Sequence, residues 1–211
     1  MHVNHRQKTL FFHVPKTGGT AIHTAFSDYK ITNKDKWEFY LGMHGNFTDL
    51  KRSHATKREF QKLMKYWKFC FVRNPWAHAV SAYFNLIDSD RWEKLDHPEP
   101  IENYKNFKWF LKTYDGESPL YRPQSHYTFY DKEFKIDKWY RYEQLQESWD
   151  DLCGRFNYEK FKLPAANITK LRKNNFDMIY PEDYRTFYDH ETIEYVANKS
   201  ENEIRQFNYQ F

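Results

Sequence analysis

Residues 8–26, KTLFFHVPKTGGTAIHTAF, constrain the fold more than any other stretch of the chain. An apolar run over residues 9–14 predicts a buried strand, and Pro15 ends it because proline cannot donate to a strand ladder. The two glycines at 18–19 allow a sharp turn and a close approach of the backbone to a ligand. A helix is expected to open at Thr20, whose hydroxyl can cap it. The sequence therefore predicts a strand, a glycine turn and a helix in immediate succession.

This turn is a favourable place for an anion. The first amides of a helix have no intrahelical partner, and the helix dipole is positive at that end. Lys16 adds a full positive charge, so the pattern predicts a cradle for a phosphate-like group. It differs from the usual P-loop because the lysine precedes the glycines, and no strand end offers a clear acidic ligand for magnesium. The predicted anion-binding residues of the turn are Lys16, Thr17, Gly18, Gly19, Thr20 and Ala21.

A second strand-to-helix junction lies further along the chain. Residues 67–73, WKFCFVR, predict another buried strand, and Asn74 and Pro75 suit the N-cap and first turn of a helix. Arg73 then lies at the carboxyl edge of the sheet, where open α/β sheets bind their ligands. Its guanidinium can grip a phosphate with two donors, and Ser81 on the following helix can add a hydroxyl.

The remaining pattern completes an α/β chain. Further helices are expected over residues 55–66, 100–115, 143–156 and 191–207, and a short strand over residues 37–41. The basic loop at residues 167–175 is expected to be either a lid that brings Arg172 or Lys173 near a nucleotide phosphate, or a solvated loop. Gln124 and His126 are candidate contacts to an acceptor.

Composition limits the class of protein. A length of 211 residues suits one domain, and a 20% aromatic content predicts a core rich in aromatic rings. The net charge of +4 suits an anionic ligand but is too small to indicate nucleic acid binding. Cys70 and Cys153 are expected as buried thiols rather than as a disulfide. Neither a signal peptide nor a membrane-length apolar run is visible, so a cytoplasmic location is expected.

The two junctions together resemble a known family. PKTGGT resembles the 5'-phosphosulfate-binding loop of sulfotransferases that use 3'-phosphoadenosine-5'-phosphosulfate (PAPS), and FVRNPWxxxVSAYF resembles their 3'-phosphate-binding element. Nearly the whole chain, including IDKWYRYEQL with Arg141 and Glu143, is similar to the bacterial and Golgi sulfotransferases of the carbohydrate 2-O- and chondroitin/HNK type. The resemblance implies a P-loop NTPase-like, three-layer α/β fold with a central, mainly parallel sheet flanked by helices, and one domain over residues 1–211.

The resemblance also implies a reaction. A sulfuryl group would move from PAPS to an acceptor hydroxyl, leaving adenosine 3',5'-bisphosphate and needing no metal. Lys16 would stabilise the charge that grows on the leaving phosphate. His54 is the expected general base, because the 2-O-sulfotransferases carry a base histidine at a comparable spacing, and His44 is the second candidate. The carboxylates of Glu38, Asp49 and Glu59 stay open as further candidates.

Three functional classes are compatible with these sequence motifs. The first is a sulfotransferase acting on a glycan or another hydroxyl compound, with no nucleic acid partner. The second is a magnesium-dependent kinase with a variant phosphate loop, which predicts an acidic metal ligand at a strand end. The third is a non-catalytic nucleotide- or glycan-binding module, which predicts either the loss of the lysine in the glycine turn or the absence of a general base. Lys16, Arg73 and Ser81 are all present, and this favours the first class.

Overall fold

The structure is a computed structural model that describes residues 1–33, 35–39, 57–87, 101–113, 121–128, 135–164 and 178–211. Its chain divides into two compact units. We call residues 1–73 and 124–166 the sheet unit, and residues 74–123 and 167–211 the helical unit. The single domain predicted over residues 1–211 stays a prediction.

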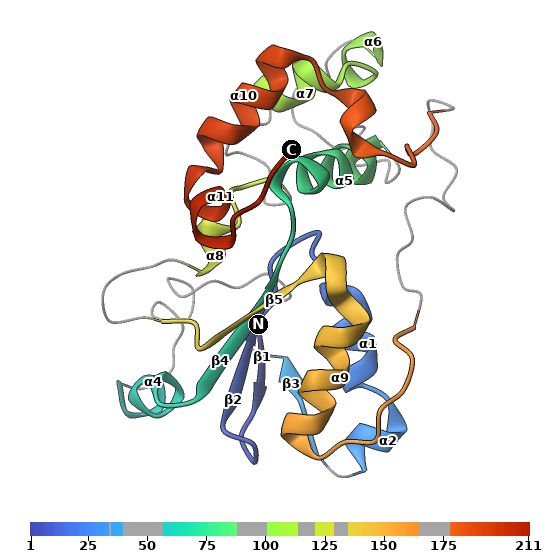
Figure 1. The fold of residues 1–211 in the computed structure, drawn as a ribbon. Coiled ribbons are helices and arrows are strands. Elements are labelled where there is room, and N and C mark those ends of the chain that lie inside the picture. Colours follow the sequence, from blue (N-terminus) through green and yellow to red (C-terminus); the bar gives the residue numbers. More distant parts are fainter. Residues whose placement is uncertain (34, 40–56, 88–100, 114–120, 129–134, 165–177) are drawn as a thin grey trace. The chain divides into compact units, whose positions relative to one another are not determined.

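The sheet unit is built on five strands in the order β3-β1-β2-β4-β5 (Figure 1). β2 pairs in parallel with β4, and β4 pairs in parallel with β5. β1 is antiparallel to both β2 and β3, so it alone of the five runs in the opposite direction. The strands are β1 (His2–Asn4), β2 (Thr9–Phe12), β3 (Glu38–Phe39), β4 (Trp67–Val72) and β5 (Lys138–Arg141).

Aromatic side chains from the sheet and from helices α1 and α9 dominate the core of this unit. Phe11 of β2 and Phe69 of β4 are fully buried and stack with ring centroids 5.0 Å apart. Phe26 and Trp149, from the covering helices, join the same cluster. This confirms the aromatic-rich core that composition predicted. The helical segments of the sheet unit are α1 (Gly19–Phe26), α2 (Tyr29–Thr32), α4 (Lys57–Met64), α8 (Ser125–Thr128), the 3-10 turn η2 (Tyr142–Gln144) and α9 (Leu145–Phe156).

The helical unit has a separate core around α5 (Pro75–Ile87). The sequence predicts one buried stripe on this helix, but every residue of α5 except Asn85 is buried. The reason is its composition, since a helix that is apolar around most of its circumference is buried on all sides. The other elements are α6 (Ile101–Tyr104), α7 (Phe107–Thr113), η4 (Tyr184–Phe187), α10 (His190–Lys199) and α11 (Glu201–Phe207).

Two predicted helices are each two helices in the structure. The helix expected over residues 100–115 divides before α7, where the Asn106 side chain accepts a hydrogen bond from the Trp109 amide at 3.0 Å. The helix expected over residues 191–207 divides at Ser200, whose ψ of 28° is not helical. Asparagine and serine compete for backbone hydrogen bonds and favour such ends over helix interiors.

The α/β class, with a mainly parallel sheet flanked by helices, is confirmed by these elements. Cys70 and Cys153 are both free and buried, as predicted. Burial raises the pKa of both thiols, that of Cys153 to about 11, so they remain protonated at neutral pH.

Candidate active site

The predicted strand, glycine turn and helix are present as β2, residues 13–18 and α1. Lys16 adopts a φ of 64°, in the left-handed region that costs a non-glycine residue about 1 kcal/mol. The Thr17 hydroxyl donates to the Val14 carbonyl at 2.9 Å, and this buried hydrogen bond stabilises the turn. Such strain in a short turn is typical of a loop that is shaped for a ligand.

The two glycines of this turn are each required for a different structural reason. Gly18 has a φ of 80°, and a Cβ there would lie 3.0 Å from Tyr142 and Leu145 side-chain atoms. Gly19 has no such angle, but a Cβ there would lie 1.9 Å from the His13 ring. The imidazole of His13 therefore packs directly against the start of α1.

The helix begins one residue earlier than expected. Gly18 is the N-cap of α1 and no side chain caps it, so Thr20 lies within the first turn and is not the cap. The Ala21 amide donates to the Gly18 carbonyl at 3.0 Å, which commits that amide to the turn. The amides of Gly19 and Thr20 come before the first intrahelical hydrogen bond, where a helix end favours an anion.

The second predicted junction brings Arg73 to the same turn. β2 and β4 are neighbouring parallel strands, so their carboxyl ends meet at one edge of the sheet. Arg73 Nη1 donates to the carbonyl oxygen of Lys16 at 3.2 Å. Two cationic residues that lie 57 positions apart in sequence are thus adjacent in one unit. An anion bound at this edge would lie in the field of both.

Arg73 is held by side chains from two further segments. Its guanidinium carbon lies 4.2 Å from the ring centroid of Tyr142, in the 3-10 turn that follows β5. The amide of Gln124 pairs with the Arg73 backbone in both directions, at 2.8 Å and 2.7 Å. The sequence suggests Gln124 as an acceptor contact, but its side chain is buried and fully engaged with Arg73. His126, the companion candidate, is exposed.

The other predicted site residues are distributed differently. Ser81 is buried in α5, which belongs to the helical unit. His54, His44, Asp49, Arg172 and Lys173 lie outside the described residues, as does the proposed lid at residues 167–175. The remaining carboxylate candidates, Glu38 and Glu59, are exposed on β3 and α4.

Two neighbouring histidines, one buried and one half-buried, connect β1 to α1. His2 of β1 stacks on Phe11, and its Nε2 lies 2.9 Å from Nδ1 of His23 in α1. Burial is the main cause that lowers the pKa of His2 to about 3, and burial also lowers the pKa of His23. Both rings are therefore neutral at physiological pH. The sequence did not predict β1, so it gave no reason to place His2 here.

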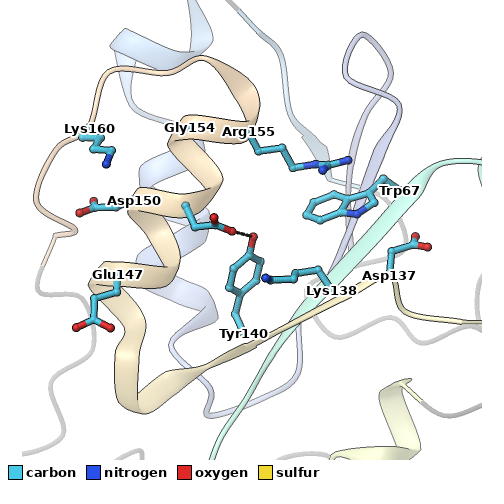
Figure 2. A pocket seen from close by; sticks show the side chains of 10 residues that line it. Trp67, Asp137, Lys138, Tyr140, Glu147, Asp150, Gly154, Arg155 and Lys160 are labelled. Atoms are coloured by element: carbon cyan, nitrogen blue, oxygen red, sulfur yellow. Dashed lines mark hydrogen bonds between the residues drawn. The ribbon is translucent and has the colours of Figure 1, made fainter.

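An open pocket of about 970 Å³ lies elsewhere in the sheet unit (Figure 2). Trp67 and Lys138 at the starts of β4 and β5 line it, together with side chains of α9. It therefore lies at the amino ends of these strands, whereas Arg73 follows the carboxyl end of β4. Figure 2 shows the Arg155 guanidinium over the Trp67 ring, and its carbon lies 3.7 Å from the ring centroid. The Tyr140 hydroxyl donates to Asp151 at 2.6 Å. None of the residues that line this pocket belongs to the glycine turn.

The described residues contain neither a metal-binding cluster nor a membrane-spanning helix. Within these residues, no group of three or more His, Cys, Asp or Glu side chains is placed to hold a metal ion. Nor does any helix in the described part of the chain have the length and apolar character needed to cross a bilayer.

Comparisons with known proteins place the chain in a family. Curated proteins gave no significant match, and neither did solved structures. The sequence model of the sulfotransferase family matches residues 1–210, nearly the whole length. The match includes both strand-to-helix junctions and agrees with the resemblance seen in their sequences. The chain therefore belongs to the sulfotransferase family.

Proposed function

We propose that this sulfotransferase takes its sulfuryl group from PAPS and transfers it to a hydroxyl group of a carbohydrate. The observation that carries the proposal is the approach of Arg73 to the Lys16 turn, with a hydrogen bond of 3.2 Å between them. A doubly phosphorylated nucleotide needs two cationic elements close together, and these residues supply them within one unit. Family membership supports sulfuryl transfer as the type of reaction.

Each end of the donor has its own proposed contacts. The 5'-phosphosulfate lies against the turn, with Lys16 and the amides of Gly19 and Thr20 as donors. The proposed contacts of the 3'-phosphate are Arg73 and Ser81, with Arg172 or Lys173 as a further proposed contact from outside the described residues. The turn fits an anion because α1 begins there, with Gly18 as its N-cap and with the amides of Gly19 and Thr20 ahead of the first intrahelical hydrogen bond.

The reaction breaks the bond between sulfur and the bridging phosphate oxygen and forms one from sulfur to the acceptor oxygen. Negative charge grows on the leaving phosphate, and Lys16 with the first amides of α1 stabilises it. The acceptor proton passes to a general base, for which we propose His54, since a neutral imidazole suits this role near pH 7. His44 is the alternative.

The donor proposal is tested by the thermal unfolding of the whole chain. Adenosine 3',5'-bisphosphate at about 100 times its dissociation constant would stabilise the protein by about 2.7 kcal/mol, or several degrees. ATP with magnesium serves as the matched comparison, because the kinase alternative predicts a preference for it. A larger shift with ATP and magnesium would overturn the proposal.

The proposed base is tested by turnover with PAPS and a panel of glycan acceptors. His54→Ala is expected to leave bisphosphate affinity within about twofold while lowering kcat by about 100-fold or more. Lys16→Ala, in contrast, lowers both donor affinity and kcat, since its charge acts on bound donor and on transition state. Retained turnover in His54→Ala would move the role to His44 or to a carboxylate.

A further inference from the structure

We infer that Tyr142 and Gln124 are positioning residues that hold Arg73 for the donor's 3'-phosphate. This inference rests on the proposed function, because it assigns Arg73 to that phosphate. Neither residue carries a charge, and neither is needed to touch the nucleotide. Both act through Arg73, one on its guanidinium and the other on its backbone.

Gln124 fixes the backbone of Arg73 at the point where β4 has ended. Its Oε1 accepts from the Arg73 amide at 2.8 Å, and its Nε2 donates to the Arg73 carbonyl at 2.7 Å. A side-chain amide carries a donor and an acceptor on neighbouring atoms, so it can pair with the N–H and C=O of one residue as a neighbouring strand would. Since Gln124 is 2% exposed, water cannot easily replace a bond that is lost.

Tyr142 fixes the guanidinium. The cation lies 4.2 Å from the ring centroid, within the range of a cation–π interaction. An aromatic face attracts a cation without adding a negative charge, so the positive field of Arg73 remains available to a phosphate. A carboxylate partner would offset that field. The same ring also limits the space beside Gly18, where a Cβ would approach it to 3.0 Å. One side chain thus contacts both anion-binding elements.

The Lys16 carbonyl completes the set of contacts. Arg73 Nη1 donates to it at 3.2 Å, which fixes the guanidinium relative to the glycine turn. The distance between the two proposed phosphate positions is then set by β2, by the segment after β5 and by residue 124. Changing Tyr142 or Gln124 should therefore alter recognition of the 3'-phosphate more than recognition of the 5'-phosphate.

The test compares two nucleotides by titration calorimetry with the full chain. Adenosine 3',5'-bisphosphate carries both phosphates, and adenosine 5'-monophosphate lacks the one assigned to Arg73. We expect Tyr142→Leu to weaken bisphosphate binding by about 10-fold and monophosphate binding by less than about twofold. Tyr142→Phe keeps the aromatic face and should retain the wild-type ratio of affinities. Gln124→Asn, whose amide is too short to reach both backbone groups, should lower the ratio as Tyr142→Leu does.

A second measurement separates positioning from a general effect on folding. In an Arg73→Ala background, Tyr142→Leu should no longer change the ratio of the two affinities, because the group it holds is gone. The inference is overturned if Tyr142→Leu and Gln124→Asn both keep the wild-type ratio, or if Tyr142→Phe loses it. A wild-type protein that does not prefer the bisphosphate would overturn the proposed function as well, so the two failures can be told apart.

Discussion

Gly18 and Gly19 are adjacent in the glycine turn, but different features of the structure select a glycine at each position. At Gly18 the backbone angle of 80° disfavours a side chain. At Gly19 the obstacle is the His13 ring, 1.9 Å from the position of a Cβ. The need for glycine at position 19 depends on both Gly19 and His13, so it can be tested by changing either residue.

Gly19→Ala should lower the free energy of unfolding by about 2 kcal/mol, because the methyl group overlaps a ring that is itself buried. Adding His13→Ala removes the overlap, so the double variant should lose less than the sum of the two single losses. Urea unfolding measures all three. Gly154→Ala is the matched control, since a Cβ there meets nothing within 4 Å and alanine favours helix α9. Additive losses in the double variant would contradict the packing explanation.

The buried histidines make stability depend on pH. The pKa of His2 is about 3 in the folded chain and about 6.5 in an unfolded one, so the unfolded state binds more protons between these values. Stability should therefore be complete above pH 6.5 and fall as the pH decreases. From pH 7 to pH 5.5 we expect a loss of about 1 to 2 kcal/mol.

His2→Phe tests this assignment because it keeps a ring on Phe11 without a titrating group. Urea unfolding at pH 7 and at pH 5.5 should give a smaller loss for the variant than for the wild-type chain. The pKa of His23 is also lowered, so His23 should cause part of the pH-dependent loss of stability to persist in the His2→Phe variant. Equal losses in both proteins would assign the pH dependence to other groups.

At the scale of elements, α5 depends on Asn74, the residue that precedes it. The Asn74 side chain accepts from the Trp76 and Ala77 amides at 3.1 Å and 3.3 Å, as its predicted role of N-cap requires. Its Nδ2 also donates to the Gln210 carbonyl at 2.8 Å. One residue thus closes the helix and anchors the end of the chain beside it.

Asn74→Ala should lower the free energy of unfolding by about 1 to 2 kcal/mol, since it removes the cap and the bond to Gln210. Asn74→Asp keeps the capping oxygen, loses the donor and adds a negative charge that a helix N-terminus favours, so it should lose less. Thermal unfolding with van't Hoff analysis compares the two. A larger loss in the aspartate variant would make the Gln210 contact, rather than the cap, the main contribution.

Local signals explain which elements were predictable from the sequence. β2 with its turn and β4 with the start of α5 are marked by apolar runs followed by proline, glycine or asparagine. β1 has three residues, and its pairing with β2 through His2↔Phe11 is a tertiary contact that no periodicity reports. The approach of Arg73 to Lys16 follows from the parallel pairing of β2 and β4. The contacts of Tyr142 and Gln124 do not, because they depend on where β5 and residues 124–128 lie in space.

At the scale of the molecule, the chain leaves the sheet unit after Arg73 and returns to it at Gln124. The two hydrogen bonds between these residues therefore join the point of exit to the point of return. The same pair holds the proposed phosphate-binding arginine, so the residue at which the chain re-enters the sheet unit supports the position of Arg73.

Hydrogen exchange can report how far the donor's contacts extend. Adenosine 3',5'-bisphosphate should slow amide exchange in the turn before α1, because Lys16 and the first amides of the helix bind the 5' end. It should also slow exchange in the first two turns of α5, where Ser81 is the proposed partner of the 3'-phosphate. Ser81→Ala should then weaken binding by about 3- to 10-fold, the effect of one hydrogen bond. Protection confined to the glycine turn, with unchanged affinity in Ser81→Ala, would remove Ser81 from the site and leave Arg73 as the proposed ligand of that phosphate.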